Sequence, residues 1–274
     1  MVLAAVGQLC ATASITSNLA QCQTLIRKAA AAGAKVLFLP EASDYIASSA
    51  EESLALAQSP DCGDFISALQ QAARGESMHI NVGIHEMASE NRLKNSLVWI
   101  DDKGIITQNY QKVHLFDVEI KDGPILKESK NVEPGQKILP PFDTPVGRVG
   151  LAICFDLRFP EISLALRRQN AEVITYPSAF TVPTGKAHWE SLLRARAIET
   201  QTYVIAAAQG GLHNEKRRSY GHSMIVNPWG EVVAELGEEY PEPQIATANI
   251  DLDLVSKIRR EMPLLRRTDI YPEV

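Results

Sequence analysis

A cysteine at residue 154 has a sequence context that suits nucleophilic chemistry. Residues 149–153 (VGLAI) form a short apolar run typical of a buried strand, and residues 155–161 turn toward a helix over 162–168 with Pro160 near its first turn. Cys154 therefore lies where a predicted strand ends, and ligand sites of α/β folds gather at the carboxyl ends of strands. Free backbone N–H groups and nearby charges there favour the thiolate, the reactive form of cysteine. The residues alone equally allow a small buried core cysteine.

Two further ionisable residues follow predicted strands in the same way. Glu41 comes soon after the apolar run 36–39 and is a candidate general base, or else an acidic residue that begins a loop or helix. Lys112 follows the predicted strand 105–110 and, if it faces inward, could hold an oxyanion or favour a thiolate. A solvent-exposed edge lysine is the alternative. Together the three residues would supply a nucleophile, a base and an oxyanion-binding cation.

Two more charged residues are candidates for supporting positions. Glu128 is a second carboxylate, in an irregular stretch over 117–135, where a solvent-exposed side chain is the alternative. Arg158 lies in the turn after the cysteine and could bind a substrate carboxylate through a bidentate fork, or pair with Glu161 or Asp156. No group of histidines and cysteines has the spacing of metal ligands, so no metal is expected.

The elements that must position these residues alternate between strands and helices. Residues 2–8, 15–32 and 36–39 are predicted as a strand, an amphipathic helix and a buried strand, which form a β-α-β unit with parallel strands. Further strands are predicted at 80–86, 94–100, 105–110, 149–153, 173–177, 203–208, 223–226, 231–234 and 245–250, and helices within 53–74 and at 162–168, 188–200 and 253–262. This mixture of β-α-β units and hairpins predicts one α/β domain over residues 1–274.

Composition limits the classes of partner. The 274 residues carry a net charge of −6, which gives no general attraction to nucleic acid or to an anionic membrane. No apolar run reaches the roughly 18 residues that span a bilayer. No secretion signal is recognisable, and the four cysteines form no C-x-x-C pair, so a cytoplasmic protein is expected. The sequence leaves open a mitochondrial form from another start site.

Four blocks of the chain resemble the signature segments of the nitrilase superfamily, and they occur in the expected order. The blocks are residues 38–41 (FLPE), 110–115 (YQKVHL), 152–161 (AICFDLRFPE) and 221–230 (GHSMIVNPWG). Within the superfamily the chain resembles the Nit branch, and in it the deaminated glutathione amidases, including their fungal members. The words that carry this finer resemblance are residues 40–45 (PEASDY), 115–118 (LFDV), 123–129 (GPILKES) and 177–181 (PSAFT).

The resemblance implies an α/β fold of a particular kind, a four-layer α-β-β-α sandwich. It implies a homodimer, with residues 264–274 as a C-terminal tail at the interface between subunits. It also implies a catalytic centre of Glu41, Lys112 and Cys154, with Glu128 as a supporting glutamate, and neither a cofactor nor a metal. The substrate pocket would lie around a set of residues in two later segments: Phe155, Arg158, Ser178, Phe180 and Thr184.

The implied reaction is hydrolysis of the amide of deaminated glutathione to 2-oxoglutarate and cysteinylglycine, a metabolite repair step that passes through a thioester on Cys154. Glu41 would take the thiol proton, and Lys112 with the backbone N–H of Phe155 would hold the oxyanion. Arg158 would suit the 2-oxo acid end of this small-molecule substrate. Three alternatives remain open: an ω-amidase acting on α-ketoglutaramate, an N-carbamoyl amino acid amidohydrolase, and a non-catalytic interaction protein on the same scaffold. The intact catalytic residues argue against the last.

Overall fold

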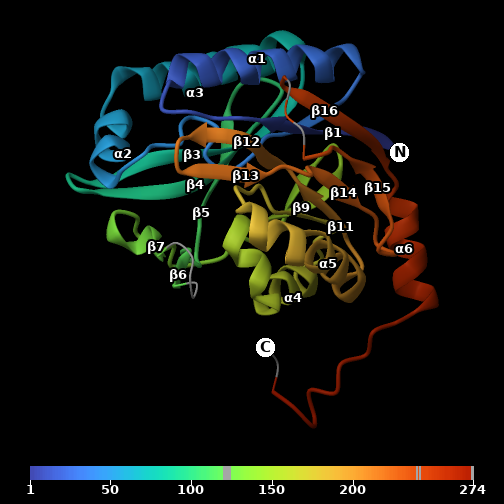
Figure 1. The fold of residues 1–274 in the computed structure, drawn as a ribbon. Coiled ribbons are helices and arrows are strands. Elements are labelled where there is room, and N and C mark those ends of the chain that lie inside the picture. Colours follow the sequence, from blue (N-terminus) through green and yellow to red (C-terminus); the bar gives the residue numbers. More distant parts are fainter. Residues whose placement is uncertain (120–124, 239, 241, 273–274) are drawn as a thin grey trace.

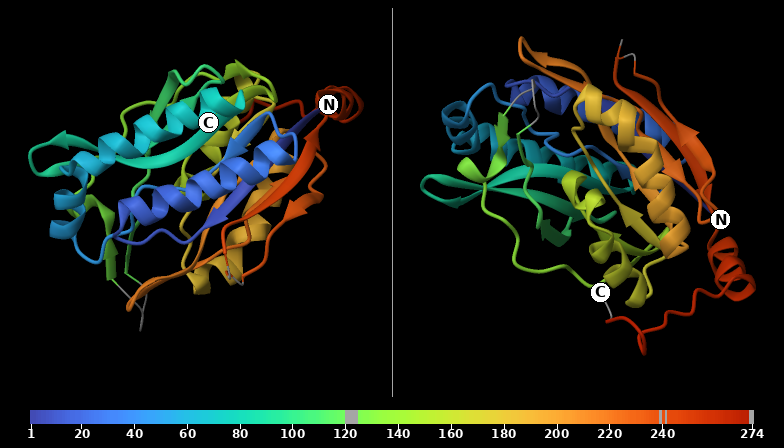
Figure 2. Two further views of the ribbon diagram at one scale, coloured as in Figure 1. Left: turned by 90° about the horizontal axis from the view of Figure 1, so that it is seen from above. Right: turned by 60° about the horizontal axis from the view of Figure 1, so that its bottom comes forward.

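Two β-sheets stacked face to face organise the fold, and helices cover the outer face of each sheet (Figure 1). The computed structural model describes residues 1–119, 125–238, 240 and 242–272. α1 (Ile15–Ala31) and α3 (Pro60–Glu76) run side by side over the first sheet, as Figure 2 shows from above. α4 (Pro160–Arg168) and α5 (Val182–Thr200) cover the second sheet. The layers confirm the predicted α-β-β-α sandwich.

The first sheet has the strand order β13-β12-β1-β2-β3-β4-β5, and β16 also pairs with β1. Its strands are β1 (Val2–Leu9), β2 (Val36–Phe38), β3 (His79–Ser89), β4 (Arg92–Ile100), β5 (Ile106–Gln111), β12 (Ala208–Asn214), β13 (Arg217–Tyr220) and β16 (Gln244–Ile250). β1, β2 and β3 are mutually parallel, which confirms the predicted β-α-β unit through α1. β1 lies between β2 on one side and β12 and β16, from the last third of the chain, on the other.

The second sheet has the strand order β15-β14-β11-β10-β9-β8. Its strands are β8 (Phe142–Thr144), β9 (Gly147–Leu151), β10 (Val173–Thr175), β11 (Tyr203–Ala206), β14 (Met224–Val226) and β15 (Val232–Glu235). β9, β10 and β11 are parallel, joined by crossovers through α4 and α5. Parallel strands in both sheets thus bring several strand ends to one side of the sandwich, where the candidate residues lie.

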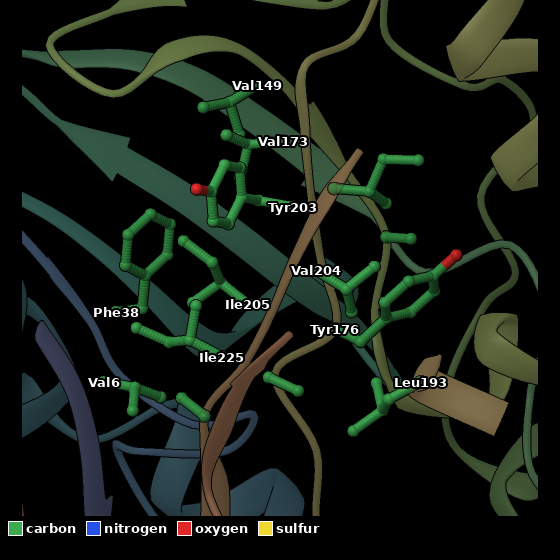
Figure 3. Packing of buried hydrophobic residues seen from close by; sticks show 14 of the residues in the cluster. Val6, Phe38, Val149, Val173, Tyr176, Leu193, Tyr203, Val204, Ile205 and Ile225 are labelled. Carbon is green, nitrogen blue, oxygen red and sulfur yellow. The ribbon is translucent and has the colours of Figure 1, made fainter. Parts of the chain in front are cut away.

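The main hydrophobic core fills the space between the two sheets. Phe38 and Val6 from the first sheet approach Ile205 and Ile225 from the second, and all four side chains are fully or almost fully buried (Figure 3). A second cluster packs α1 and α3 onto the outer face of the first sheet. The alternation of side chains along each strand therefore serves two cores, which explains the nearly continuous apolar runs seen in the sequence.

The remaining elements are short or peripheral. They are α2 (Ala50–Ala57), a hairpin of β6 (Asp117–Glu119) and β7 (Ile125–Lys127), two 3₁₀ turns (Glu128–Lys130 and Cys154–Arg158) and α6 (Leu252–Glu261). Residues 262–272 run away from the body as an exposed tail (Figure 1). The last two residues of the predicted tail, 273 and 274, lie outside the described residues, as do residues 120–124 with the Gly123-Pro124 pair. In the described part of the chain, no helix is both long and apolar enough to cross a membrane.

The structure corrects the sequence analysis in three places. The hairpin β12–β13 was not predicted, because β13 carries exposed Arg217 and Arg218 and has no apolar alternation. α5 begins at Val182 rather than at residue 188, since Pro183 occupies the first turn of the helix, where a proline is tolerated. The stretch 117–135 is not wholly irregular, because it contains β6, β7 and a 3₁₀ turn.

Candidate active site

The ends of strands from both sheets meet at one buried group of ionisable residues. Glu41 follows β2, Lys112 follows β5, and Cys154 follows β9 of the second sheet. Their exposed fractions are 5%, 2% and 7%. Glu128, in the 3₁₀ turn after β7, completes the group. The structure therefore brings together the four residues predicted from the sequence.

Cys154 occupies a strained turn between β9 and its 3₁₀ turn. Its φ angle is +45°, a conformation that residues with a side chain rarely adopt. The backbone N–H of Cys154 donates to the carbonyl of Pro177 at the end of β10 (3.0 Å), which fixes the turn against the neighbouring strand. The next N–H, that of Phe155, has no acceptor among the described residues. An unused donor beside the thiol is what an oxyanion-binding site requires.

The main chain around Glu41 is held by two close contacts. A Cβ on Gly83 of β3 would lie 2.5 Å from the Cα of Glu41, so only glycine allows β3 to approach this closely. The side-chain amide of Gln209 donates to the carbonyls of Glu41 (3.0 Å) and Ala42 (3.1 Å). Ala42 itself has a φ of +55°, and the Gln209 amide stabilises this turn from the side of β12.

Two carboxylates share one ammonium group and one amide. Lys112 Nζ lies 2.9 Å from Glu41 Oε1 and 2.9 Å from Glu128 Oε2. The side-chain amide of Asn95 donates to Glu41 Oε1 (2.8 Å) and Glu128 Oε1 (2.9 Å). The backbone N–H of Phe116 also donates to Glu128 Oε2 (2.7 Å). These donors compensate the burial of two negative charges beside one positive charge.

The second oxygen of Glu41 faces the second sheet. Glu41 Oε2 accepts a hydrogen bond from the backbone N–H of Ala179, after β10 (3.0 Å). The thiol of Cys154 lies close enough to the Glu41 carboxylate for the charge of Glu41 to raise the pKa of the thiol. Glu41 is thus positioned to accept the thiol proton without moving.

The charges at the site follow from these contacts. Burial alone would raise the pKa of Glu41, but the positive charge of Lys112 and the hydrogen bonds donated by Lys112 and Asn95 lower it below its ordinary value. Burial would lower the pKa of Lys112, but Glu128 and Glu41 raise it well above its ordinary value. Burial and the charge of Glu41 raise the pKa of the Cys154 thiol. A raised thiol pKa favours the protonated thiol, so a base such as Glu41 is needed to form the nucleophile, as the resemblance implied.

We expect Asn95→Ala to lower kcat about 10- to 100-fold, because each lost hydrogen bond to a buried charge is worth about 1.5–3 kcal/mol. The isosteric change Asn95→Asp should cost more, since it adds a third carboxylate. Steady-state kinetics at neutral pH would measure both. Asn109→Ala is the matched control, since its amide also binds a carboxylate, that of Glu86, but on the exposed outer face of the sheet. Full activity in Asn95→Asp would contradict the role of Asn95 as a necessary donor to Glu41 and Glu128.

Arg158 points between two aromatic rings rather than toward an acid. Its guanidinium carbon lies 5.8 Å from the ring centre of Phe155 and 5.5 Å from that of Phe180. One Nη atom donates to His188 Nδ1 (3.3 Å). Of the carboxylates in residues 1–119, 125–238, 240 and 242–272, none forms a salt bridge with Arg158, so the alternative pairing with Glu161 or Asp156 is wrong. The charge of Arg158 remains available for a ligand.

Asp156, which was considered above as a partner of Arg158, instead holds the cysteine turn in place. It is completely buried, and it accepts hydrogen bonds from Tyr110 (2.7 Å) and the backbone N–H of Ile153 (3.0 Å). Its other oxygen accepts from the backbone N–H of His114 (3.0 Å) and lies 2.8 Å from His114 Nδ1. Asp156 therefore ties the cysteine turn to the segment that flanks Lys112.

Of the remaining predicted pocket residues, Phe180 and Thr184 lie at or just before the start of α5, and Ser178 lies in the packing beneath the site. Phe180 is almost buried and packs on Trp189, and the hydroxyl of Thr184 lies 2.8 Å from that of Thr181 in the first turn of α5. Ser178 has no exposed surface, and its hydroxyl donates to the carbonyl of Tyr176 (2.9 Å). We therefore assign Ser178 to the packing beneath the site, not to a substrate contact.

Several residues of the site were missed by sequence reasoning. They are Asn95, Asp156, Gln209 and the backbone N–H groups of Phe116 and Ala179. Asn95 and Asp156 lie next to predicted strand ends, which is a weak signal, whereas nothing in the sequence points to Gln209. No group of three potential metal ligands occurs among the described residues.

The four-layer sandwich is the fold of the nitrilase superfamily, as the four sequence blocks predicted. Comparison with known proteins agrees. The carbon-nitrogen hydrolase family matches residues 3–260. The chain therefore belongs to the carbon-nitrogen hydrolase family, whose members include amidases.

Within this family, the chain is similar to several individual proteins along almost its whole length. The chain is 53% identical to the probable hydrolase nit2 of Schizosaccharomyces pombe, over 100% of both chains. It is 46% identical to the human deaminated glutathione amidase, over 98% of this chain and 83% of that protein. Among solved structures, the NitFhit protein of C. elegans matches with a TM-score of 0.93 at 41% identity, over 98% of this chain and 66% of that longer chain.

Proposed function

We propose that this protein hydrolyses the amide of deaminated glutathione to 2-oxoglutarate and cysteinylglycine, as a metabolite repair amidase. The observation that carries the proposal is a buried thiol beside the Glu41 carboxylate, which in turn is held by Lys112. The 46% identity to the human deaminated glutathione amidase, along almost the whole chain, supports this choice of substrate.

The first half of the reaction forms a thioester. Glu41 takes the proton of the Cys154 thiol, and the sulfur attacks the amide carbonyl carbon. The resulting oxyanion is held by the ammonium group of Lys112 and by the free backbone N–H of Phe155. Because the pKa of the thiol is raised and that of Glu41 is lowered, the proton transfer is uphill in the free enzyme. We infer that it occurs together with the attack, when the oxyanion forms beside Lys112.

The second half of the reaction releases both products. Glu41, now protonated, gives its proton to the nitrogen of the leaving cysteinylglycine, and the C–N bond breaks. A water molecule then gives a proton to Glu41 and attacks the thioester, which frees 2-oxoglutarate and restores the thiol. Glu128 contributes by keeping Lys112 charged throughout, since Lys112 must not lose its proton if it is to hold an oxyanion.

The acid end of the substrate fits the surroundings of Arg158. A guanidinium flanked by Phe155 and Phe180 is partly shielded from water, which strengthens its attraction for a carboxylate. A 2-oxo acid places its carboxylate at the end of the acyl part, and Arg158 lies in the same turn as the nucleophile. We propose that Arg158 binds this carboxylate.

A product assay tests the proposed substrate. The enzyme would be supplied with deaminated glutathione, α-ketoglutaramate and an N-carbamoyl amino acid in parallel, with cysteinylglycine, ammonia and carbon dioxide as the readouts. We expect cysteinylglycine release to have the highest kcat/KM. Ammonia from α-ketoglutaramate alone would establish an ω-amidase instead, and carbon dioxide would establish a carbamoylase. No product from any of the three would favour the interaction protein.

We also propose that residues 1–274 form one domain and that two copies form a homodimer. The core shared by the two sheets supports a single domain. The tail supports the dimer, because it carries large apolar side chains that are exposed in the single subunit: Leu264, Leu265, Ile270 and Tyr271. Light scattering should give the mass of two chains for the full protein, and of one chain after removal of residues 264–274. An unchanged mass after this removal would contradict a tail-mediated dimer.

A further inference from the structure

A second ionisable pair lies next to the candidate site, and no step described above uses it. His85 on β3 is the cross-strand partner of Asn95, the residue that joins the two catalytic carboxylates. Asp44 lies three residues after Glu41. His85 Nδ1 lies 3.0 Å from Asp44 Oδ1, and the backbone N–H of His85 donates to Asp44 Oδ2 (2.6 Å). The carboxylate thus fixes both the ring and the strand that carries it.

The alternation of side chains along β3 shows which face His85 occupies. Val82 and Ile84 pack into the cluster beneath α1 and α3, on the outer face of the sheet. His85 therefore points to the inner face, which also carries the side chain of Asn95. Its ring stacks on Tyr45 with 4.4 Å between ring centres, and 14% of its side chain is exposed. Nε2 has no hydrogen-bond partner in the described part of the chain.

The surroundings of His85 favour its charged form. Burial alone would lower the pKa of the imidazole, but the charge and hydrogen bond of Asp44, with the charges of Glu41 and Glu128, raise it above its ordinary value. When the ring is protonated, Nδ1–H is used by Asp44 and Nε2–H remains free. A positive charge with one unused donor is suited to bind an anion.

The reaction decides which part of a substrate lies on this side of the site. The acyl part becomes attached to Cys154 and extends toward Arg158. The leaving nitrogen must lie beside Glu41, which protonates it, and Asp44 and His85 belong to the chain segments around Glu41. The leaving group of the proposed substrate is a dipeptide that ends in a carboxylate. Two extended residues span about 7 Å, so the terminal carboxylate of the leaving dipeptide would reach beyond the groups in direct contact with Glu41.

We propose that His85, held by Asp44, is a specificity-determining residue that binds the terminal carboxylate of the leaving peptide. The two ends of the substrate would then be bound by two cations, Arg158 at the acyl end and His85 at the leaving end. This proposal rests on the proposed function and narrows the substrate class to amides whose leaving amine carries a carboxylate. Such a pair of cations would discriminate against α-ketoglutaramate, whose leaving group is only ammonia.

The test combines one protein variant with one substrate analogue. Deaminated glutathione and its glycine amide, in which the terminal carboxylate becomes a carboxamide, would be assayed with the wild type and with His85→Asn. We expect the wild type to lose about tenfold or more in kcat/KM on the amide, as for other hydrogen bonds to charged groups. His85→Asn should show a similar loss on the acid and almost no further loss on the amide. Equal wild-type rates on both substrates, or an unchanged ratio in His85→Asn, would overturn the proposal.

Two controls separate recognition from general damage. α-Ketoglutaramate has no leaving carboxylate, so His85→Asn should lose more on deaminated glutathione than on this substrate, and equal losses would overturn the proposal. His79→Asn changes a histidine at the other end of the same strand and should keep the wild-type ratio between acid and amide. If the wild type releases no cysteinylglycine at all, the proposed function fails and this proposal fails with it. If cysteinylglycine is released but the ratio of the rates on acid and amide is the same in His85→Asn as in the wild type, only the proposed role of His85 is overturned.

Discussion

Replacement of Cys154 by alanine is expected to abolish cysteinylglycine release, with a loss in kcat of at least about 10⁴-fold. The proposed reaction has no route without the sulfur, because the acyl group must be attached to an atom that can leave again when water attacks. The fold should survive the change. Alanine meets the same backbone strain at this turn as cysteine does, and the structural hydrogen bond of residue 154 is made by its backbone N–H. Product release by mass spectrometry and thermal unfolding would be measured together.

Cys10→Ala is the matched control for this experiment. Cys10 is also a buried cysteine just beyond the end of a parallel strand, and burial raises the pKa of its thiol to about 11. Its sulfur donates to the carbonyl of Leu212 (3.4 Å) rather than facing Glu41. Cys10→Ala should therefore keep most of the activity. Substantial turnover in Cys154→Ala would contradict the thioester mechanism, whatever the control shows.

Replacement of Lys112 by methionine is expected to damage both catalysis and folding. The loss of one oxyanion donor typically costs about 10²–10³ in rate, and we expect at least about 10³-fold here, because Glu41 also loses the charge that keeps it ionised. Removing one partner from a buried ion pair costs about 3–5 kcal/mol in the free energy of unfolding. In this variant Glu41 and Glu128 would face each other across Asn95 with no cation between them.

The loss of stability in Lys112→Met should depend on pH in a definite direction. In the wild type the pKa of Glu41 is lowered by folding, so its stabilising contribution is present above the pKa of the unfolded chain and is lost as the pH falls. Without Lys112 the pKa of Glu41 should rise above that of the unfolded chain, because burial is no longer offset by the nearby positive charge. The stability deficit of the variant should then shrink as the pH is lowered from about 7 to about 5, because Glu41 takes up a proton. Urea unfolding at several pH values would measure it.

Lys94→Met provides the matched control for the lysine. Lys94 lies on β4 next to Asn95, but on the outer face of the sheet, and within the described residues it forms no salt bridge. The same loss of charge there should leave kcat and the pH dependence of stability nearly unchanged. A stability deficit in Lys112→Met that grows as the pH falls would rule out the proposed charge arrangement.

The parts of the site that were predictable are those that local sequence determines. Apolar runs end just before Glu41 and Cys154, and a strand pattern ends before Lys112, so all three mark strand ends that a sheet can bring together. The contribution of Asn95 depends instead on the register of β3, β4 and β5 in the sheet, since a shift by one residue would turn its amide to the outer face. Register is set by long-range packing, which a single sequence does not display.

The unpredicted parts share the same physical origin. Gln209 reaches the main chain of Glu41 from a hairpin that pairs with β1, 200 residues away along the chain. The sequence placed Arg158 beside the nucleophile. It did not show that Asp156 would be hydrogen-bonded to Tyr110 and His114 instead of to Arg158. Both the contact of Gln209 with Glu41 and the unpaired state of Arg158 depend on hydrogen bonds between residues far apart in the chain. Such bonds leave no periodic pattern in the sequence.

The position of β1 between early and late strands has a consequence for the synthesis of the protein. β1 is synthesised before two of its neighbours, β12 and β16, which lie in the last third of the 274 residues. Gln209 and the N–H of Ala179, which hold Glu41 in place, also arrive late. An incomplete chain therefore contains Cys154 and Glu41 but lacks the supports that align them. The arrangement of Glu41 and Cys154 described here is therefore complete only after β12 has been synthesised.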